Sequence, residues 1–204
     1  AYIVDPVVVD ELDPAFRLTG LAGCERRAAW HSLPQKAVAK RYAEENGKDY
    51  RDLCLIVAHL GAGISVGAHR HGPVVAVNHA LYDGPMTPER AGSLPNHLLL
   101  AEGPASPCAP GEGFLHRVTR EGGLRSHLGS SDLPEAYAAA AQGDGHAQIV
   151  LQAFVQGIVA EICSRLPWLG GGLPDRVLLT GELTLCPELV RDLVDRLAGL
   201  GLAV

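Results

Sequence analysis

A histidine followed at once by a glycine-rich segment is the first feature of this sequence that could do chemistry. The segment reads "HLGAGISVG", with His59 before Gly61 and Gly63. Glycines let the backbone approach a ligand closely, and their amides can surround phosphate oxygens. The spacing fits neither a Walker loop nor a dinucleotide fingerprint, because the third glycine comes one position late and a strand-like stretch follows it. A tight turn between two strands, without a ligand, explains these glycines equally well.

Four further positions could serve a ligand. Arg90 lies in "TPERAGSLP", and an arginine in a rigid loop can stabilise the charge on a transferring phosphoryl group. Asp5 follows a short apolar stretch, His31 precedes the start of a predicted helix, and Gly181 follows the apolar stretch "VLLT". The carboxyl ends of strands in α/β proteins are where ligands bind. Each also has a plain structural explanation, as an exposed arginine, a turn aspartate, a capping histidine or a simple turn.

Patterns typical of metal sites and disulfide frameworks are weak. "HRH" would place His69 and His71 on one face of a strand, but no third ligand is evident, so a solvated hairpin tip is the better interpretation. The five cysteines are scattered without ligand spacing, which predicts a reducing, cytoplasmic compartment. Cys54 falls inside an apolar run and is expected in the core.

The overall charge argues against some partners. With 17 basic and 23 acidic side chains the net charge is −6, so nothing attracts nucleic acid or an anionic membrane over the whole surface. We also expect no membrane span, because apolar runs appear shorter than the roughly 20 residues that a span requires. A phosphorylated ligand would have to be held by local groups.

The elements that must position these residues follow from the pattern of apolar positions. Alternating strands and helices predict an α/β fold with a mixed sheet. We expect the stretch 98–114, which holds a cluster of Pro and Gly, to be a loop. Ser32 is a candidate cap of the first helix, and Ser130, Ser131 or Asp132 of the second. The predicted strands are 2–5, 53–59, 64–70, 73–79 and 176–181, and the predicted helices are 32–47, 130–143, 146–166 and 187–201.

Taken in order, several segments resemble the butyrate kinase branch of the acetate, propionate and butyrate kinase family, within the actin, sugar kinase and Hsp70 superfamily. They are "AYIVDPVVVDE", "WHSLPQKAVAKR", "LIVAHLGAGISVGAHRHG", "PERAGSLP", "GGLRSHLGSSD" and "VLLTG". The resemblance implies two duplicated RNase H-like lobes, each with a mixed sheet and flanking helices, with ATP between them. Residues 1–12 would be the end of the N-terminal lobe and the crossover. Residues 13–204 would be the second, nucleotide-side lobe, incomplete at its end.

The resemblance also implies an activity and a set of roles. The reaction would be reversible phosphoryl transfer between ATP and a short-chain fatty acid, butyrate, with Mg²⁺, in an enzyme that is a homodimer when intact. Arg90 and His31 would stabilise the transferring phosphoryl group, and Asp5 would sit beside the magnesium. The residues bordering the nucleotide would be His59, Gly61 and Gly63 at the phosphates and Gly181 and Asp132 at the nucleoside.

The chemistry is consistent with these residue types. A carboxylic acid is already ionised at neutral pH and needs no general base, so Asp5 is better placed to organise metal or water than to take a proton. Two positions depart from the family pattern, since Glu182 replaces a second glycine and Pro134 stands where an adenine-side arginine is common. These departures keep open a catalytically incomplete nucleotide-binding lobe as an alternative. Acetate or propionate kinase remains an alternative within the family, and a Rossmann-type dehydrogenase fits poorly.

Overall fold

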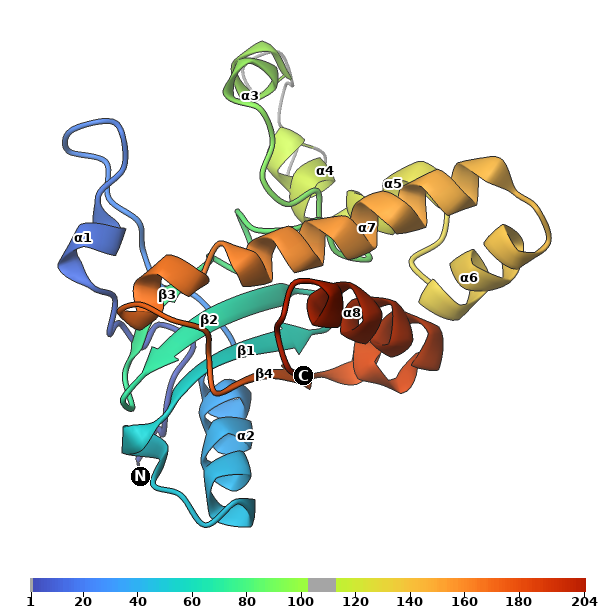
Figure 1. Ribbon diagram of the computed structural model, residues 1–204. Coiled ribbons are helices and arrows are strands. Elements are labelled where there is room, and N and C mark those ends of the chain that lie inside the picture. The colour runs from blue at the N-terminus through green and yellow to red at the C-terminus, as the bar shows by residue number, and fades with distance from the viewer. Residues whose placement is uncertain (1, 103–112) are drawn as a thin grey trace.

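The chain folds around one four-stranded mixed sheet, seen in a computed structural model that describes residues 2–102 and 113–204 (Figure 1). The strand order is β3-β2-β1-β4. β1 pairs antiparallel with β2 and parallel with β4, and β2 pairs antiparallel with β3, as the sequence predicted for a mixed sheet. The strands are β1 (Cys54–Leu60), β2 (Ile64–Arg70), β3 (Val74–Val77) and β4 (Arg176–Thr180).

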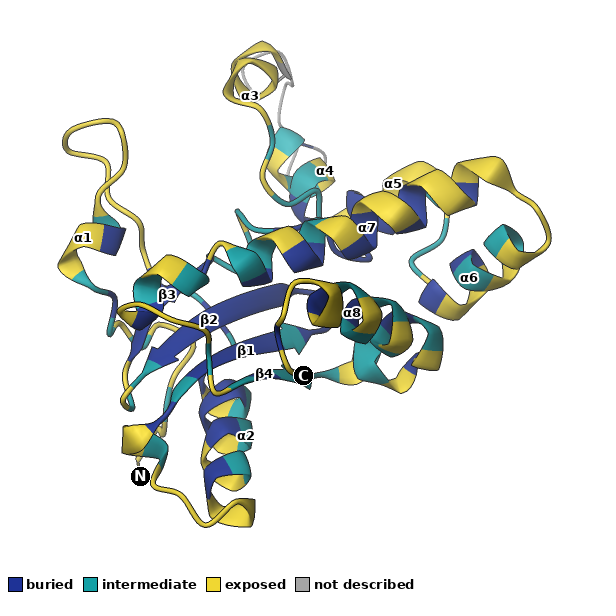
Figure 2. Ribbon diagram, in the orientation of Figure 1, coloured by how far each residue is buried: buried dark blue, intermediate teal, exposed yellow. Residues whose placement is uncertain are grey.

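Helices cover both faces of the sheet, which is why the strands are apolar almost throughout. α2 (Ser32–Glu45) lies on one face, while α7 (Gly145–Cys163) and α8 (Pro187–Gly199) lie on the other (Figure 1). Alternate residues of β1 point to opposite faces. Leu55 and Val57 pack against α2, and Ile56 packs in the larger core under α7 and α8. Figure 2 shows the sheet buried between these layers.

The remaining described elements are short. Among them, α3 and the segment around α1 project from the body of the molecule and are largely exposed (Figure 2). The helices are α1 (Pro14–Arg17), α3 (Asn96–Glu102), α4 (Phe114–Arg120), α5 (Gly123–Leu128) and α6 (Leu133–Ala141), with 3-10 helices η1 (Tyr50–Asp52), η2 (Leu166–Leu169) and η3 (Glu182–Leu185).

Several local predictions are wrong. The stretch 2–5 forms no strand in the described chain and Tyr2 is 99% exposed, because no sheet edge pairs with it. Ser32 is the first helical residue rather than the cap, and its hydroxyl donates to the carbonyls of Asp5 and Pro6. The predicted loop 98–114 is partly helical, since α3 and α4 overlap its two ends, and 103–112 lie outside the described residues.

The expectation of a solvated hairpin tip at "HRH" is half wrong. His71 lies at the tip with a φ of 55°, outside β2 and exposed. His69 instead is fully buried under α2, where Tyr50 and Gln35 supply hydrogen bonds to both ring nitrogens. Within the described residues, no group of three or more His, Cys, Asp or Glu is placed to hold a metal ion.

The expectation that apolar runs are too short for a membrane span fails for one helix. The segment Gly145–Leu169 runs from the start of α7 to the end of η2. By length and composition alone, it is long and apolar enough to cross a membrane. Its apolar side packs on the sheet in the core, through Val150, Phe154 and Ile158 among others. A core helix has this length and composition as well, so the segment is explained by its place in the fold.

Candidate functional site

Two histidines stack on the α2 face of the sheet, where β1 ends and α2 begins. The rings of His31 and His59 lie 4.0 Å apart between centroids at an interplanar angle of 20°. His59 is opposite Ser65 in the antiparallel register of β1 and β2, so these side chains share a face. His31 is at the N-cap position of α2, where its side chain makes no capping hydrogen bond, and its Nδ1 is 2.7 Å from the Ser65 hydroxyl. Strand register and helix start together bring the two rings into contact.

Both imidazoles are held neutral near pH 7. Burial lowers the pKa of His31 to about 4, and the nearby His59 and Arg90 lower it further in the same direction. Burial also lowers the pKa of His59, while Glu182 acts in the opposite sense. The Nδ1 atom of His59 is buried and has no hydrogen-bond partner among the described residues. A buried polar atom without a partner marks a place where a ligand or solvent atom can bind.

Arg90 lies against the glycine loop. Its Nη1 donates to the Ala80 carbonyl at 2.7 Å, and the guanidinium crosses Gly63 so closely that a Cβ there would collide with it. A side chain at position 63 would therefore displace the Arg90 guanidinium from this place. Gly61 is different, because a Cβ there would be 3.4 Å from His59 Nε2, an ordinary contact. Room for a ligand is the remaining reason for a glycine at that position.

A buried threonine joins the arginine loop to the glycine loop. Thr87 Oγ1 donates to the Ala62 carbonyl at 2.7 Å and accepts from the Arg90 amide at 3.0 Å. The start of α5 is pressed against this loop, because Leu124 N donates to the Thr87 carbonyl and Gly123 has a φ of 61° and no room for a Cβ. The arginine therefore sits in a loop fixed on two sides.

Gly181 closes the other edge of the glycine loop. Its φ is 99°, and a Cβ there would collide with the backbone of Leu60, so only glycine fits between β4 and the end of β1. The next residue, Glu182, reaches across and its Oε1 accepts from the Ala62 amide at 3.1 Å. A carboxylate thus occupies one of the amide donors that a phosphate-binding loop would offer.

The other two predicted site residues, Asp5 and Asp132, have other partners within the described part of the chain. The Asp5 carboxylate is 3.4 Å from Lys36 Nζ, and Asp5 itself has a φ of 44°. Asp132 caps α6, accepting from the Glu135 amide at 2.9 Å, and Pro134 suits the first turn of that helix. Arg125 nevertheless ties the two regions together, because it donates to Glu89, beside Arg90, and to Ser131, beside Asp132.

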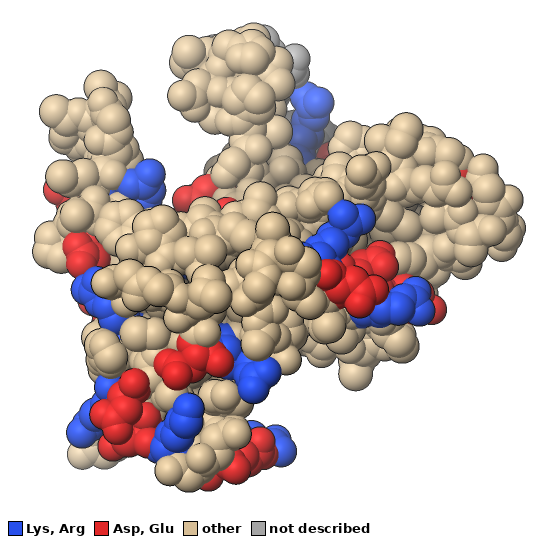
Figure 3. Space-filling model, viewed as in Figure 1, with Lys and Arg blue, Asp and Glu red and all other residues tan. Residues whose placement is uncertain are grey.

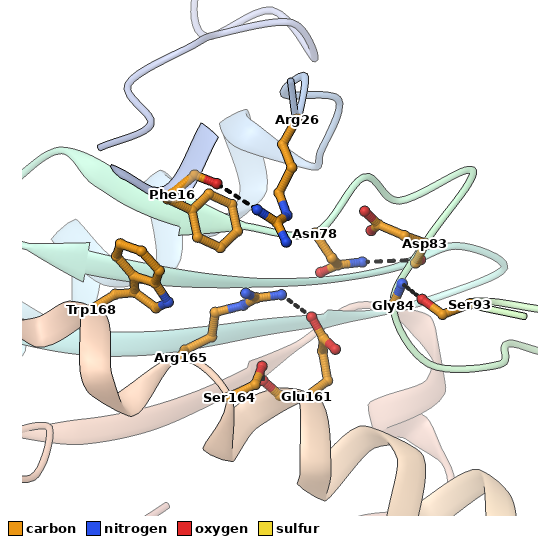
Figure 4. A pocket seen from close by; sticks show the side chains of 10 residues that line it. All are labelled: Phe16, Arg26, Asn78, Asp83, Gly84, Ser93, Glu161, Ser164, Arg165 and Trp168. Atoms are coloured by element: carbon orange, nitrogen blue, oxygen red, sulfur yellow. Dashed lines mark hydrogen bonds and ion pairs between the residues drawn. The ribbon is translucent and has the colours of Figure 1, made fainter. Parts of the chain in front are cut away.

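A polar cavity of about 350 Å³ lies elsewhere, and none of the predicted site residues line it (Figure 4). Two arginines bracket the ring of Phe16, with Cζ atoms 5.1 Å (Arg26) and 5.4 Å (Arg165) from its centroid. Glu161 pairs with Arg165, and burial raises the pKa of Asp83 on the opposite wall. The cavity is lined by Phe16, Arg26, Asn78, Asp83, Gly84, Ser93, Glu161, Ser164, Arg165 and Trp168.

Comparison with known proteins assigns this arrangement to a family. The model of the acetokinase family matches residues 22–204. The chain belongs to the acetokinase family. It is 41% identical over 194 residues to a probable butyrate kinase of Clostridium botulinum (strain Alaska E43 / Type E3), covering 95% of this chain and 54% of that protein. The chain thus spans about half the length of the curated relative it matches.

Solved acetokinase structures share the fold. The acetate kinase of Porphyromonas gingivalis superposes with a TM-score of 0.82 at 20% identity, covering 97% of this chain and 51% of that one. A propionate kinase of Francisella tularensis subsp. tularensis SCHU S4 superposes with a TM-score of 0.80 at 20% identity, covering 93% and 50%. The predicted fold class, a lobe of the actin, sugar kinase and Hsp70 type with a mixed sheet and flanking helices, is confirmed.

The structure also brings in residues that sequence reasoning missed. Thr87, Ser65 and Gln35 are all buried, and each connects a candidate site residue to the rest of the fold. A weak signal for Ser65 was a hydroxyl inside an apolar strand directly after the glycine loop. Gln35 lies four residues after His31, one turn along the same helix face.

The residues at the loop fit a phosphate-bearing group in part. The unpartnered His59 Nδ1, the space over Gly61 and the fixed Arg90 suit an anion, whereas Glu182 on the Ala62 amide does not. For Mg²⁺, the chain offers Asp5 as a carboxylate. Since magnesium in such sites is held by one or two carboxylates together with phosphate oxygens, Asp5 could supply only part of its coordination.

Proposed function

We propose that this chain is the nucleotide-side lobe of an ATP-dependent kinase that phosphorylates a short-chain fatty acid to an acyl phosphate. The observation that carries the proposal is the group formed by His31, His59 and Arg90 around the loop of Gly61 and Gly63. It combines a fixed guanidinium with imidazole and amide donors at one place. Family membership supports a carboxylate as the acceptor.

Each side chain has a proposed part in the transfer. The incoming carboxylate is already ionised, so the step needs neutralisation of charge rather than a base. Arg90 stabilises the equatorial oxygens of the transferring phosphoryl group, and His31 donates a hydrogen bond to the same group. His59 and the amides around Gly61 and Gly63 hold the nucleotide phosphates.

The proposed roles at the metal and the nucleoside follow from the family resemblance. Asp5 would hold Mg²⁺ directly or through water, and the metal would neutralise phosphate charge. Lys36, now within 3.4 Å of Asp5, would have to share that carboxylate or release it. Gly181, packed against Leu60, and Asp132, beside the Ser131 that Arg125 contacts, would border the nucleoside.

Butyrate is the proposed acyl substrate. Two observations support it: the extended "ISVGAHR" after the glycine loop, and the 41% identity to a probable butyrate kinase. We further propose that residues 1–12 belong to a first lobe, since Tyr2, Ile3 and Val4 expose apolar side chains that a partner sheet would cover. A cytoplasmic homodimer is proposed from the resemblance, and the four described cysteines are free thiols.

The choice of partner agrees with the surface charge. On the face drawn in Figure 3, the Lys and Arg side chains around α2 and α8 lie next to Asp and Glu side chains. Such an interspersed surface suits a small carboxylate bound at a local site better than a polyanion bound along a face.

A hydroxamate assay for acyl phosphate tests the proposal. The full-length protein, with both lobes, is incubated with MgATP and butyrate, isobutyrate, propionate or acetate, and the highest kcat/KM is expected for butyrate. Absence of acyl phosphate with all four acids would refute the kinase, and a preference for acetate would refute the butyrate assignment. Arg90→Ala is the control for chemistry at this site, because a contaminating kinase would be unaffected by it.

One observation favours a second function, a nucleotide-binding lobe without catalysis. Glu182 places a carboxylate on the Ala62 amide, where a phosphate would bind. Binding of MgADP without acyl phosphate formation by the protein would support this function over the kinase.

A further inference from the structure

A continuous line of hydrogen bonds runs under α2 from the far end of β2 to His31. Tyr50 Oη is 2.7 Å from His69 Nδ1, and His69 Nε2 is 3.1 Å from Gln35 Oε1. Gln35 Nε2 is 2.8 Å from Ser65 Oγ, which is 2.7 Å from His31 Nδ1. Gln35, Ser65 and His69 are each buried to 1% exposure or less. Groups this deeply buried must satisfy one another, so their proton positions can be worked out.

The direction of the line is fixed by one backbone carbonyl. The Ser65 carbonyl is an acceptor only, and the Gln35 side chain contacts it at 2.9 Å, so the atom of Gln35 at that position must be the NH₂ nitrogen. Gln35 Oε1 therefore faces His69 and must accept from His69 Nε2–H. Burial lowers the pKa of His69 to about 3, so this ring is neutral and its Nδ1 accepts. Burial raises the pKa of Tyr50, whose hydroxyl keeps its proton between two groups, the Gly72 carbonyl at 2.5 Å and His69 Nδ1 at 2.7 Å.

The same reasoning fixes the proton positions at the His31 end of the line. Ser65 Oγ accepts from Gln35 Nε2 at 2.8 Å and from the His31 backbone amide at 3.3 Å. A hydroxyl has two lone pairs and one proton, so both lone pairs are used. Its proton is left for His31 Nδ1, which must be the acceptor. Neutral His31 then carries its own proton on Nε2.

We infer that Ser65, oriented by Gln35 and His69, is a positioning residue that holds His31 in the Nε2–H tautomer. The functional meaning of this tautomer rests on the proposed function, because a phosphoryl oxygen needs a hydrogen-bond donor and Nε2–H supplies one. The other tautomer would turn a lone pair toward that oxygen and repel it. The line of hydrogen bonds thus makes a neutral histidine a fixed donor beside the fixed guanidinium of Arg90.

The tautomer can be observed directly, without any activity. Two-bond ¹⁵N–¹H spectra of ¹⁵N-labelled protein at pH 7.5 distinguish protonated from unprotonated ring nitrogens, with His31 assigned by its loss in His31→Gln. The wild-type protein should show His31 Nε2 protonated and Nδ1 unprotonated. In Ser65→Ala the two nitrogens should move toward intermediate shifts, and Ser65→Thr, which keeps the hydroxyl, should restore the wild-type pattern.

A variant at the Tyr50 end of the line is the control for simple misfolding. Tyr50→Phe removes the hydroxyl that contacts His69 Nδ1 and the Gly72 carbonyl, and leaves Ser65 and Gln35 in place. The ring of His69 should change its shifts while that of His31 does not. A wild-type His31 protonated on Nδ1, or a Ser65→Ala spectrum identical to wild type, would overturn the inference.

Kinetics then separate this inference from the proposed function. In the hydroxamate assay Ser65→Ala should lower kcat by roughly five- to tenfold, the value of one hydrogen bond, with the KM for ATP nearly unchanged and with recovery in Ser65→Thr. If the spectra are as expected but wild type forms no acyl phosphate, the kinase is refuted and the positioning role stands. If acyl phosphate forms and the tautomer is wrong, the positioning role is refuted and the kinase stands.

Discussion

Removing the Glu182 carboxylate should tighten nucleotide binding. In the structure its Oε1 accepts from the Ala62 amide at 3.1 Å, and the side chain is exposed. A phosphate that binds this loop must displace that hydrogen bond or tolerate a like charge beside it. Both effects oppose binding, so their loss in Glu182→Gly should raise affinity.

The size of the effect follows from the two terms. An exposed hydrogen bond contributes roughly 0.5–1 kcal/mol, and two unit charges about 4 Å apart repel by about 1 kcal/mol in water. Together they amount to roughly 1.5–2 kcal/mol. Since 1.4 kcal/mol corresponds to tenfold in affinity, Glu182→Gly should bind MgADP roughly ten- to thirtyfold more tightly. Glu182→Gln keeps an acceptor without the charge and should lie between wild type and Glu182→Gly.

Isothermal titration calorimetry with MgADP at two salt concentrations measures both terms. The charge term is screened by salt, so the gain in Glu182→Gln should shrink at high ionic strength, while the remaining difference to Glu182→Gly persists. Glu188→Gln is the matched control. It removes a negative charge on α8, where the Glu188 carboxylate contacts Cys186, and should leave the affinity for MgADP unchanged. Equal or weaker binding by Glu182→Gly would refute the reasoning, and a wild type and variants that all fail to bind would refute the nucleotide site.

The remaining predictions concern Arg90, His69 and Gly181. Arg90→Ala should lower kcat for acyl phosphate formation by on the order of 10²-fold or more, as for comparable charge-stabilising groups, and Arg90→Lys should recover little because the bond to the Ala80 carbonyl is lost. Because the pKa of buried His69 is lowered to about 3, the unfolded chain binds more protons below pH 6.5; His69 alone should therefore contribute about 2 kcal/mol less stability at pH 5 than at pH 7.5 in urea denaturation, His31 acts in the same direction, and a flat profile would contradict this. Gly181→Ala should lower the free energy of unfolding by roughly 2 kcal/mol or more, since its φ of 99° and the Leu60 backbone both exclude a Cβ, and an unchanged denaturation midpoint would count against it.

The central sheet and the long helices could be predicted because their buried positions are apolar at the spacing of a strand or a helix. β1 is apolar along its length, the hairpin of β2 and β3 turns at Gly72, and α7 buries one side at helical spacing. The stretch 2–5 has the same apolar character as a strand and yet forms none. A strand requires a neighbouring edge, and no local pattern states whether that edge exists.

The polar part of the candidate site was harder to foresee. His69 was expected at a solvated hairpin tip because "HRH" has no evident third metal ligand, but its partners Tyr50 and Gln35 lie 19 and 34 positions away. Such contacts depend on register and packing rather than on neighbouring sequence. Two features of the site could be predicted, the glycine turn after β1 and the glycine turn after β4. Both depend on the backbone, and the glycine residues themselves indicate them in the sequence.

The two secondary-structure periods explain why these particular residues meet. His59, Ser65 and His69 occupy odd positions of an antiparallel pair whose register sets His59 against Ser65, so all three face α2. His31 and Gln35 are four residues apart on α2 and meet that face one turn apart. A slip of one residue in β1 would turn His59 toward α7, and a slip of one residue in β2 would turn His69 toward α7 and leave Gln35 buried without these partners. The hydrogen-bond line and the register therefore stabilise each other, and a variant that breaks the line at Ser65 should also lower the stability of the strand pair.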